Sequence, residues 1–249
     1  MDRTAILTGA GGVLGQAIAS ELVGDGLNVA LLDIDADRLA RVAGELGGST
    51  LEVRCDITQE AQVSAAVGRV VDAWGWADVL VNNAGIEPHD RLDAMDLGNW
   101  DRALALNVRA PMLLVKHLIP HWRARGGGAV ISIGSRAWLS GSSGAAYGAS
   151  KAALVGLTRA VAVELGPLGV TANVVAPSYF PSPLNESYGD DAYRAEFGAR
   201  FAEASALRRL ISPSDVARTV AFLASPAARN ITGEVLNVSA GAHLPPTVR

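Results

Sequence analysis

The sequence predicts an α/β fold in which one parallel sheet is covered by helices on both faces. Short apolar, β-branched runs alternate with longer helical runs along the whole chain, which is typical of strand–helix–strand units. An apolar fraction of 49% against 18% charged residues fits strands that are buried on both faces. No linker, repeat or low-complexity run divides the 249 residues, so we expect a single domain over 1–249.

The charge balance and cysteine content exclude several classes of protein. A net charge of −4 and a pI near 5.6 leave no strongly basic surface, so we expect no nucleic-acid partner and no membrane partner. The long uncharged stretch 165–185 is interrupted by prolines and does not fit a membrane span. The single cysteine, Cys55, allows no internal disulfide and indicates a cytoplasmic protein.

A glycine-rich turn follows the first predicted strand, 4–8. The seven residues from Gly9 to Gly15 lead directly into a helix that we expect to reach about Gly24. This order lets the backbone approach a pyrophosphate, which the N–H groups and positive end of the helix would bind. The predicted dinucleotide contacts are Gly9, Gly11, Gly12, Leu14 and Gly15. The alternative is a purely structural turn.

An acidic residue ends the second predicted strand, 28–32. Asp33 stands 18 residues after Gly15, about the spacing at which an acidic side chain accepts hydrogen bonds from the adenosine ribose. The same carboxylate would repel the 2′-phosphate of NADP, so Asp33 predicts NAD as the cofactor. The alternative is that Asp33 caps the next helix, 36–46, although Asp35 is better placed for that.

The middle of the chain adds further polar features. We expect a strand over 51–55 ending at Asp56, a helix over 60–74, a strand over 78–81 and then Asn82-Asn83-Ala84-Gly85 at the carboxyl edge of the sheet. A long helix over 97–122 carries Asn107 in its interior, where asparagine is unfavourable and more often faces solvent. His117 and His121 lack a further ligand at suitable spacing, so we predict no metal site.

A strand, a small-residue loop and a helix carry the candidate catalytic residues. Ser135 follows the strand 127–134, and the next helix, to about Gly166, carries Tyr147 and Lys151 four residues apart on one face. A lysine ammonium beside a phenol favours the phenolate and lowers a pKa that is about 10 in isolation. Tyr147 is thus a candidate proton donor and acceptor, and Ser135 could hold a substrate oxygen. The alternative is a core tyrosine beside a lysine that reaches water.

The last third combines a strand, an aromatic segment and a capped helix. Strand 169–176 ends at Pro177 and Ser178, with Ser182 shortly after. The segment 178–212 is rich in aromatic residues, so we predict a substrate lid, with ordinary packing of a helical pair as the alternative. A helix capped at Ser212 and Asp215 and a strand over 234–238 follow.

Together these motifs resemble the short-chain dehydrogenase/reductase family over the whole chain. The resemblance rests on Ser135, on Tyr147-x-x-x-Lys151, on the Asn-Asn-Ala-Gly run and on the glycine turn. It implies a doubly wound, Rossmann-like parallel sheet of seven strands in the order 3-2-1-4-5-6-7, and a homotetramer or homodimer. The chain departs from the family pattern at Val13, at Ser178 and at 239–241, where Ser-Ala-Gly replaces the common Asp-Gly-Gly.

The same resemblance implies NAD-dependent interconversion of a secondary alcohol and a ketone. Tyr147 would be the general acid/base, Lys151 would lower its pKa and hold the nicotinamide ribose, Ser135 would orient the substrate oxygen, and Asn107 would support a proton relay. Besides Tyr147 and Lys151, the remaining cofactor contacts would be Asp56, Ile57, Asn83, Ala84, Gly85, Pro177 and Ser182. Two other classes stay open: a non-redox lyase, dehalogenase or epimerase of the same family, and a non-catalytic dinucleotide-binding sensor.

Apolar rings with a few polar tips are expected to form the substrate pocket. The predicted walls are Ile86, Pro88, His89, Ala137, Trp138, Tyr179 and Phe180. The guanidinium of Arg136 could bind an anionic substrate, because it directly follows Ser135. Strand alternation, however, would place the Arg136 side chain on the opposite face from Ser135 and Ala137. We therefore expect a neutral alcohol or ketone of small to medium size.

Overall fold

In the computed structural model, seven strands form one parallel sheet in the predicted order. The structure describes residues 3–141, 143–182 and 189–244. The strand order is β3-β2-β1-β4-β5-β6-β7, and each pair of neighbours is parallel. The strands are β1 Thr4–Thr8, β2 Asn28–Asp33, β3 Thr50–Arg54, β4 Val79–Asn82, β5 Gly128–Ile133, β6 Val170–Pro177 and β7 Val235–Val238.

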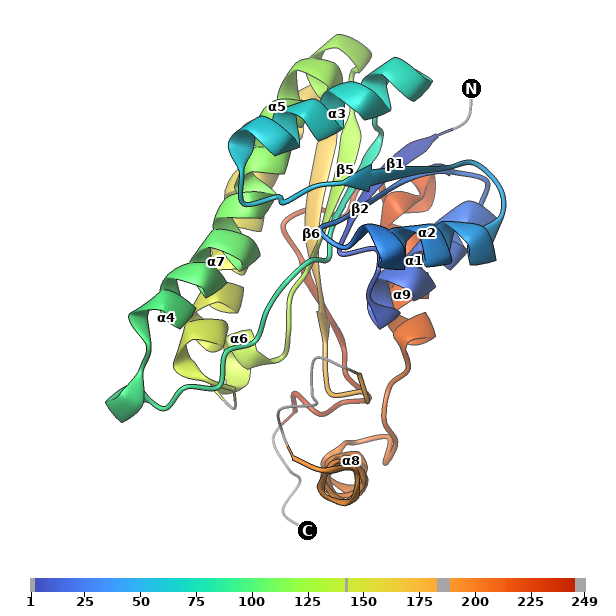
Figure 1. Cartoon of the computed structure of the whole chain (residues 1–249). Helices are drawn as coiled ribbons and strands as arrows, with labels where there is room; N and C mark the ends of the chain where they lie inside the picture. The colour runs from blue at the N-terminus through green and yellow to red at the C-terminus, as the bar shows by residue number, and fades with distance from the viewer. Residues whose placement is uncertain (1–2, 142, 183–188, 245–249) are drawn as a thin grey trace.

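Two layers of helices cover the two faces of this sheet (Figure 1). One layer consists of α1 Val13–Gly24, α2 Ala36–Leu46 and α9 Pro213–Ala224. The other contains α3 Glu60–Trp74, α4 Leu97–Leu104, α5 Ala110–Arg125 and α7 Ala145–Leu165. The short helix α6 Ala137–Ser140 precedes α7, and α8 Asp191–Ala204 lies apart from both layers (Figure 1). Single helical turns occupy Leu92–Ala94, Gly166–Leu168 and Pro226–Ala228.

The central strands are buried on both faces, as their apolar composition predicts. Along β1, Ala5 and Leu7 pack into the core beneath α1, α2 and α9, whereas Ile6 packs into the core beneath α3, α5 and α7. This alternation follows from the two-residue repeat of a strand. Since both faces are apolar, the polar residues that bind ligands are left to the strand ends, where the chain leaves the sheet.

The predicted helix over 97–122 is one continuous stretch with a widened turn in its middle. Between α4 and α5, the π-helical turn Ala105–Arg109 interrupts the α-helical hydrogen bonding. Asn107 lies in this turn and is 1% exposed, so it does not face solvent. Turns of this kind mark functional sites in many helices.

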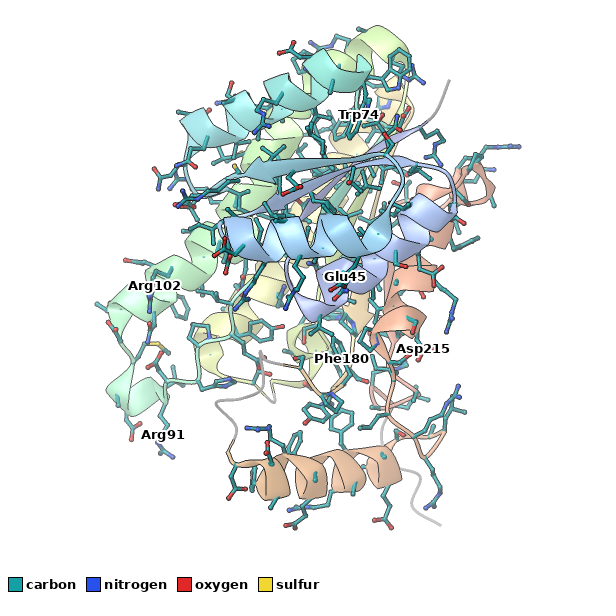
Figure 2. All side chains as sticks on the ribbon, turned by 45° about the vertical axis from the view of Figure 1, so that its right-hand side comes forward. Glu45, Trp74, Arg91, Arg102, Phe180 and Asp215 are labelled. Carbon is teal, nitrogen blue, oxygen red and sulfur yellow. The ribbon has the colours of Figure 1, made fainter. Side chains whose placement is uncertain are left out.

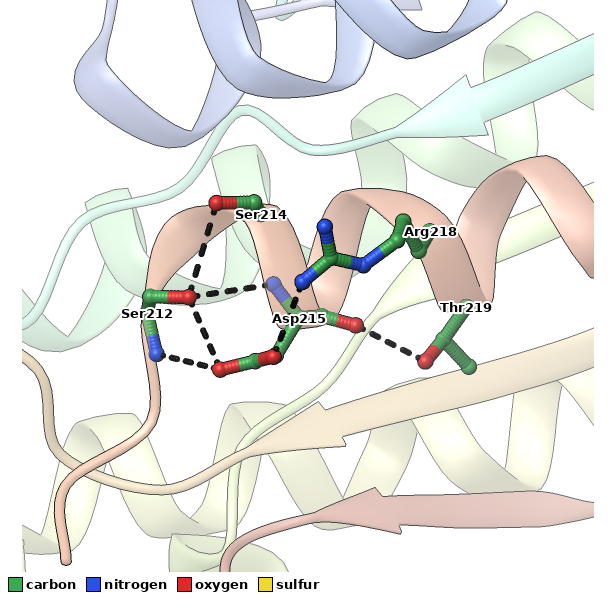
Figure 3. A network of polar contacts seen from close by, with 5 residues as sticks. All are labelled: Ser212, Ser214, Asp215, Arg218 and Thr219. Atoms are coloured by element: carbon green, nitrogen blue, oxygen red, sulfur yellow. Dashed lines mark hydrogen bonds and ion pairs between the residues drawn. The ribbon is translucent and has the colours of Figure 1, made fainter.

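The predicted cap of α9 is a complete capping box (Figure 3). The Ser212 backbone N–H donates to Asp215 Oδ2 at 2.8 Å, and Asp215 N–H donates to Ser212 Oγ at 3.3 Å. The backbone N–H and the hydroxyl of Ser212, which both donate to the Asp215 carboxylate, hold its pKa below the usual value, with a smaller contribution from Arg218. The cap fixes where the chain re-enters the α1/α9 layer after the 178–212 segment.

Some element boundaries differ from the prediction by one or two residues. β3 begins and ends one residue earlier, so Cys55 lies just beyond it. Cys55 is buried, and burial together with the neighbouring Asp56 raises its thiol pKa to about 11. Within the described ranges, no helix is long and apolar enough to cross a membrane. Residues 183–188 of the predicted lid, with the aromatic Tyr188, lie outside the described residues.

The turn after β7 contains a strained alanine. Among the described residues only Arg208 and Ala240 adopt a positive φ without being glycine, and Ala240 has φ +51°. Ala240 occupies one of the positions where Ser-Ala-Gly replaces the Asp-Gly-Gly of the resemblance.

We predict that Ala240→Gly stabilises the protein by about 0.5–1 kcal/mol, because relief of left-handed strain exceeds the added entropy of the unfolded chain. Chemical denaturation would measure the free energy of unfolding. Ala242→Gly, in the same turn but without a positive φ, is the control and should be neutral or destabilising. A loss of stability in Ala240→Gly would contradict the strain argument.

Candidate active site

The glycine turn between β1 and α1 packs too closely for side chains at three positions. A Cβ on Gly11 would lie 2.7 Å from Arg38 Cβ. Gly9 has φ +63°, and a Cβ there would lie 2.8 Å from Ala84 Cα. A Cβ on Gly15 would lie 2.2 Å from the Gly9 carbonyl oxygen. Gly12, by contrast, has room for a Cβ, and Val13 is simply the first, partly exposed residue of α1. The departure at Val13 is therefore accommodated without Gly12 taking over a glycine-specific role.

Asp33 lies at the end of β2 and faces this turn. Its carboxylate accepts hydrogen bonds from Gly11 N at 3.0 Å and from Asp35 N at 3.1 Å. Asp35 caps α2, as predicted, by accepting from Asp37 N and Arg38 N. Two backbone N–H groups thus fix Asp33 at the wall of the cleft, together with the side chains of Arg38 and Arg41.

The Asn-Asn-Ala-Gly run ties β4 to β1. Asn83 Nδ2 donates to the carbonyl oxygens of Thr8 and Gly9, at 3.0 and 3.1 Å. The backbone N–H groups of Asn83 and Ala84 donate to Thr8 Oγ1. Asn82, whose side chain is buried, makes neither of these contacts. The second asparagine therefore holds the two loops together at the carboxyl edge of the sheet.

Asn107 connects the loop after β4 to α7. Its amide accepts from Ile86 N at 3.0 Å and donates to Ile86 O and to Ser150 Oγ, both at 2.9 Å. Ser150 is fully buried and donates in turn to Tyr147 O at 2.8 Å. The structure therefore brings Asn107 next to the helical turn that carries Tyr147 and Lys151.

Ser135, Tyr147 and Lys151 line the same cleft as the glycine turn and Asp33. The Lys151 ammonium lies 5.5 Å from the centre of the Tyr147 ring and donates to Ile133 O at 2.8 Å. Ser135 Oγ accepts from Ala137 N at 3.1 Å, which leaves the hydroxyl hydrogen available for a substrate oxygen. The whole cleft has a volume of about 1530 Å³, enough for a dinucleotide and a small substrate.

Lys151 is a buried cation. Burial lowers its pKa from 10.5 to about 8, and the negative charge of Glu87 opposes this shift. Glu87 follows Ile86 in the loop held by Asn107 and lines the cleft. The charge of Lys151 thus depends on an acidic residue that the sequence analysis did not single out.

All predicted cofactor positions lie on the wall of this cleft. These are Gly9, Gly11, Gly12, Leu14, Gly15, Asp33, Asp56, Ile57, Asn83, Ala84, Gly85, Tyr147, Lys151, Pro177 and Ser182. The tight approach at Gly9 and Gly15, the start of α1 and the fixed Asp33 carboxylate fit a dinucleotide. No cluster of three or more metal-ligating side chains occurs among the described residues.

The structure brings together part of the predicted substrate wall. Ile86, Ala137, Tyr179 and Phe180 line the cleft, but Pro88, His89 and Trp138 do not. Pro88 and His89 pack against the start of α7, where a Cβ on Gly144 would lie 2.5 Å from Pro88 O. Trp138 instead packs beside the buried cluster of Val155, Val174 and Ala176.

Four further residues complete the wall at the α8 end of the cleft. Arg136 lies there with Tyr193, Phe197 and Phe201 of α8, and Figure 2 shows Phe180 between the main body and this helix. The four-residue spacing of the three aromatic residues is the signal that they share a helix face. Strand alternation does not apply to Arg136, because β5 ends at Ile133.

A parallel sheet of this order, with a glycine turn and an acidic strand end at its carboxyl edge, defines the class of dinucleotide-binding α/β folds. Within that class the chain belongs to the short-chain dehydrogenase/reductase family. The family model that matches residues 9–243 is described as enoyl-(acyl carrier protein) reductase.

Named relatives cover nearly the whole chain. A cis-4-hydroxycyclohexanecarboxylate dehydrogenase from Sinomonas cyclohexanicum is 36% identical over 96% of each chain. The 3-ketoacyl-(acyl-carrier-protein) reductase from Brucella melitensis, solved with NADH, is 32% identical, with a TM-score of 0.87 over 97% of this chain and 98% of that one. The aldohexose dehydrogenase from Thermoplasma acidophilum is 31% identical, with a TM-score of 0.89 over 100% and 96%.

We predict that Lys151 titrates near pH 8 and that Glu87→Gln moves this titration to lower pH, because it removes the charge that favours the ammonium. The chain contains only two lysines, Lys116 and Lys151, so ε-carbon-labelled lysine would give two NMR signals to follow against pH.

The Lys116 signal serves as the internal reference in that titration. Glu45→Gln removes the same charge from α2 and should leave the Lys151 midpoint unchanged. A Lys151 midpoint near pH 10.5 would contradict the effect of burial. A midpoint that does not change in Glu87→Gln would contradict the effect of the Glu87 charge.

Proposed function

We propose that the protein is an NAD(H)-dependent oxidoreductase that interconverts a secondary alcohol and a ketone. The observation that carries this proposal is the convergence of Ser135, Tyr147 and Lys151 on the cleft that Asp33 and the glycine turn also line. The names of the relatives support it, since two are dehydrogenases of hydroxylated compounds and one is a ketoacyl reductase.

The side chains of the cleft would handle the proton and the orientation of the substrate. When bound, NAD(H) supplies the hydride chemistry. Ser135 donates a hydrogen bond to the substrate oxygen, and Tyr147 exchanges the proton with that oxygen. The Lys151 ammonium, 5.5 Å from the ring, favours the ionised phenol by charge attraction. Asn107 fixes the loop and the helix from which these groups project.

The proposal extends to assembly and location. Large apolar side chains are exposed on α4, α5 and α7, at Leu97, Met112 and Val163, which supports a homotetramer or homodimer that covers them. We place this enzyme in the cytoplasm, in keeping with its single buried cysteine. The described parts of the predicted lid, 178–182 and 189–212, would close over the substrate end of the cleft.

We predict that Tyr147→Phe lowers turnover by about 10²–10⁴-fold, because the phenol carries the proton. A panel of secondary alcohols and NAD, followed at the NADH absorbance band, would find the substrate. An NADH fluorescence titration should show that cofactor binding is retained. Tyr193→Phe removes a phenol from the same cleft and serves as the control. Near-full activity of Tyr147→Phe would refute the assignment.

We further predict that the protein prefers NADH to NADPH by more than about tenfold, because the Asp33 carboxylate repels the 2′-phosphate at close range. Asp33→Ser should narrow the difference, since Arg38 and Arg41 already stand at this wall. Asp37→Ser removes a nearby charge outside the cleft wall and should leave the ratio of the two dissociation constants unchanged. Equal affinities of the native protein for NADH and NADPH would contradict this prediction.

A further inference from the structure

Arg136 lies in a turn rather than in a strand, and this changes where its side chain can reach. Beyond the end of β5, Arg136 has helical backbone angles and its N–H donates to Pro177 O at 3.0 Å. It directly precedes α6 and directly follows Ser135. The face alternation of a strand therefore does not separate its side chain from the side chain of Ser135, and both line the cleft.

Two distant segments position the guanidinium group. The group lies 5.2 Å from the centre of the Phe201 ring on α8. Its Nη1 donates to Ala242 O, in the turn after β7, at 3.4 Å. A guanidinium has five N–H donors in a planar fork, a geometry that matches a carboxylate. The side chain is thus held as a cationic part of the cleft wall.

The wall around Arg136 is aromatic. The Tyr179 ring meets Phe197 edge-on at 4.9 Å between centroids and lies 5.7 Å from Phe201, while Tyr193 stacks on Phe197 at 6.4 Å. All four rings line the cleft. Apolar rings of this kind favour a flat or cyclic hydrocarbon body, and the planar fork of an arginine favours a carboxylate.

The acidic residues of the cleft wall, Asp33, Asp56 and Glu87, lie on other segments than Arg136. The negative charge of Glu87, in the loop held by Asn107, acts on Lys151. It therefore disfavours an anion beside Lys151, whereas Arg136 favours one beside α8. A carboxylated substrate would be oriented by these two charges, with its hydroxyl carbon toward Ser135 and Tyr147.

We propose that Arg136 is a specificity-determining residue that binds the carboxylate of a cyclic secondary alcohol between Ser135 and the aromatic face of α8. The proposal rests on the proposed function and replaces the neutral substrate expected from the sequence with an anionic one. It names Arg136, which no motif of the chain marks, as the residue that selects the substrate.

Calorimetry on the NADH-saturated protein tests this without turnover. The probes are cyclohexanecarboxylate and cyclohexanecarboxamide, which share the ring and differ in charge. We expect the carboxylate to bind about 30-fold more tightly, in line with a hydrogen bond to a charged group. Arg136→Gln should remove this preference while the carboxamide still binds within about threefold of its original affinity, which also reports that the pocket is folded.

Two further variants separate charge, geometry and long-range effects. Arg136→Lys keeps the charge but loses the planar fork, so it should retain only part of the preference. Arg200→Gln removes an arginine from the exposed side of α8, where Arg200 pairs with Glu196, and should leave both probes unchanged. Equal binding of both probes to the native protein, binding of neither, or an equal loss of both in Arg136→Gln would overturn the proposal.

The outcomes distinguish this inference from the proposed function. Turnover of neutral secondary alcohols without carboxylate-selective binding would leave the oxidoreductase assignment standing and refute the anion site. Carboxylate-selective binding that depends on Arg136, together with no NADH formation from any carboxylated or neutral alcohol, would support the anion site and refute the oxidoreductase assignment.

Discussion

Each hydrogen-bonding atom of the Asn107 amide contacts a segment other than its own helix. Its oxygen and nitrogen bond the backbone of Ile86, and the nitrogen also bonds Ser150, which precedes Lys151. Because the amide is 1% exposed, loss of any of these bonds would leave a buried polar group unsatisfied. Asn107 lies in the π-helical turn between α4 and α5. The bonds of its amide therefore fix the position of the loop that carries Glu87 relative to α7, the helix that carries Tyr147 and Lys151.

The fixed position of Glu87 relative to Lys151 determines the charge state of Lys151 in the cleft. Lys151 is 4% exposed, and burial alone would push it toward the neutral amine. Glu87 counters this effect from the loop that Asn107 fixes. At pH 7 the lysine remains a cation, since its pKa is about 8, but it lies close enough to neutrality to respond to any charge added nearby.

The sequence predicted what local patterns determine and missed what distant contacts determine. The alternation of strands and helices and the cap at Ser212 follow from apolar periodicity and local hydrogen bonding, and both are confirmed. The strand order came from the family resemblance, and it is also confirmed. The partners of Asn107 could not be predicted from residues alone, since Ile86 and Ser150 are 21 and 43 residues away. Strand alternation did not apply to Arg136, because β5 stops at Ile133, one residue before its predicted end.

Because α8 lies apart from the two helical layers, its residues can change without a change in the packing of those layers (Figure 1). The aromatic residues of α8 shape one end of the cleft, while the helix contributes no strand to the sheet and no residue to the glycine turn. Substitutions at Tyr193, Phe197 or Phe201 can alter the shape of the pocket without touching the buried core. The shape of this end of the pocket can therefore change without loss of the packing that holds the sheet and its two helical layers together.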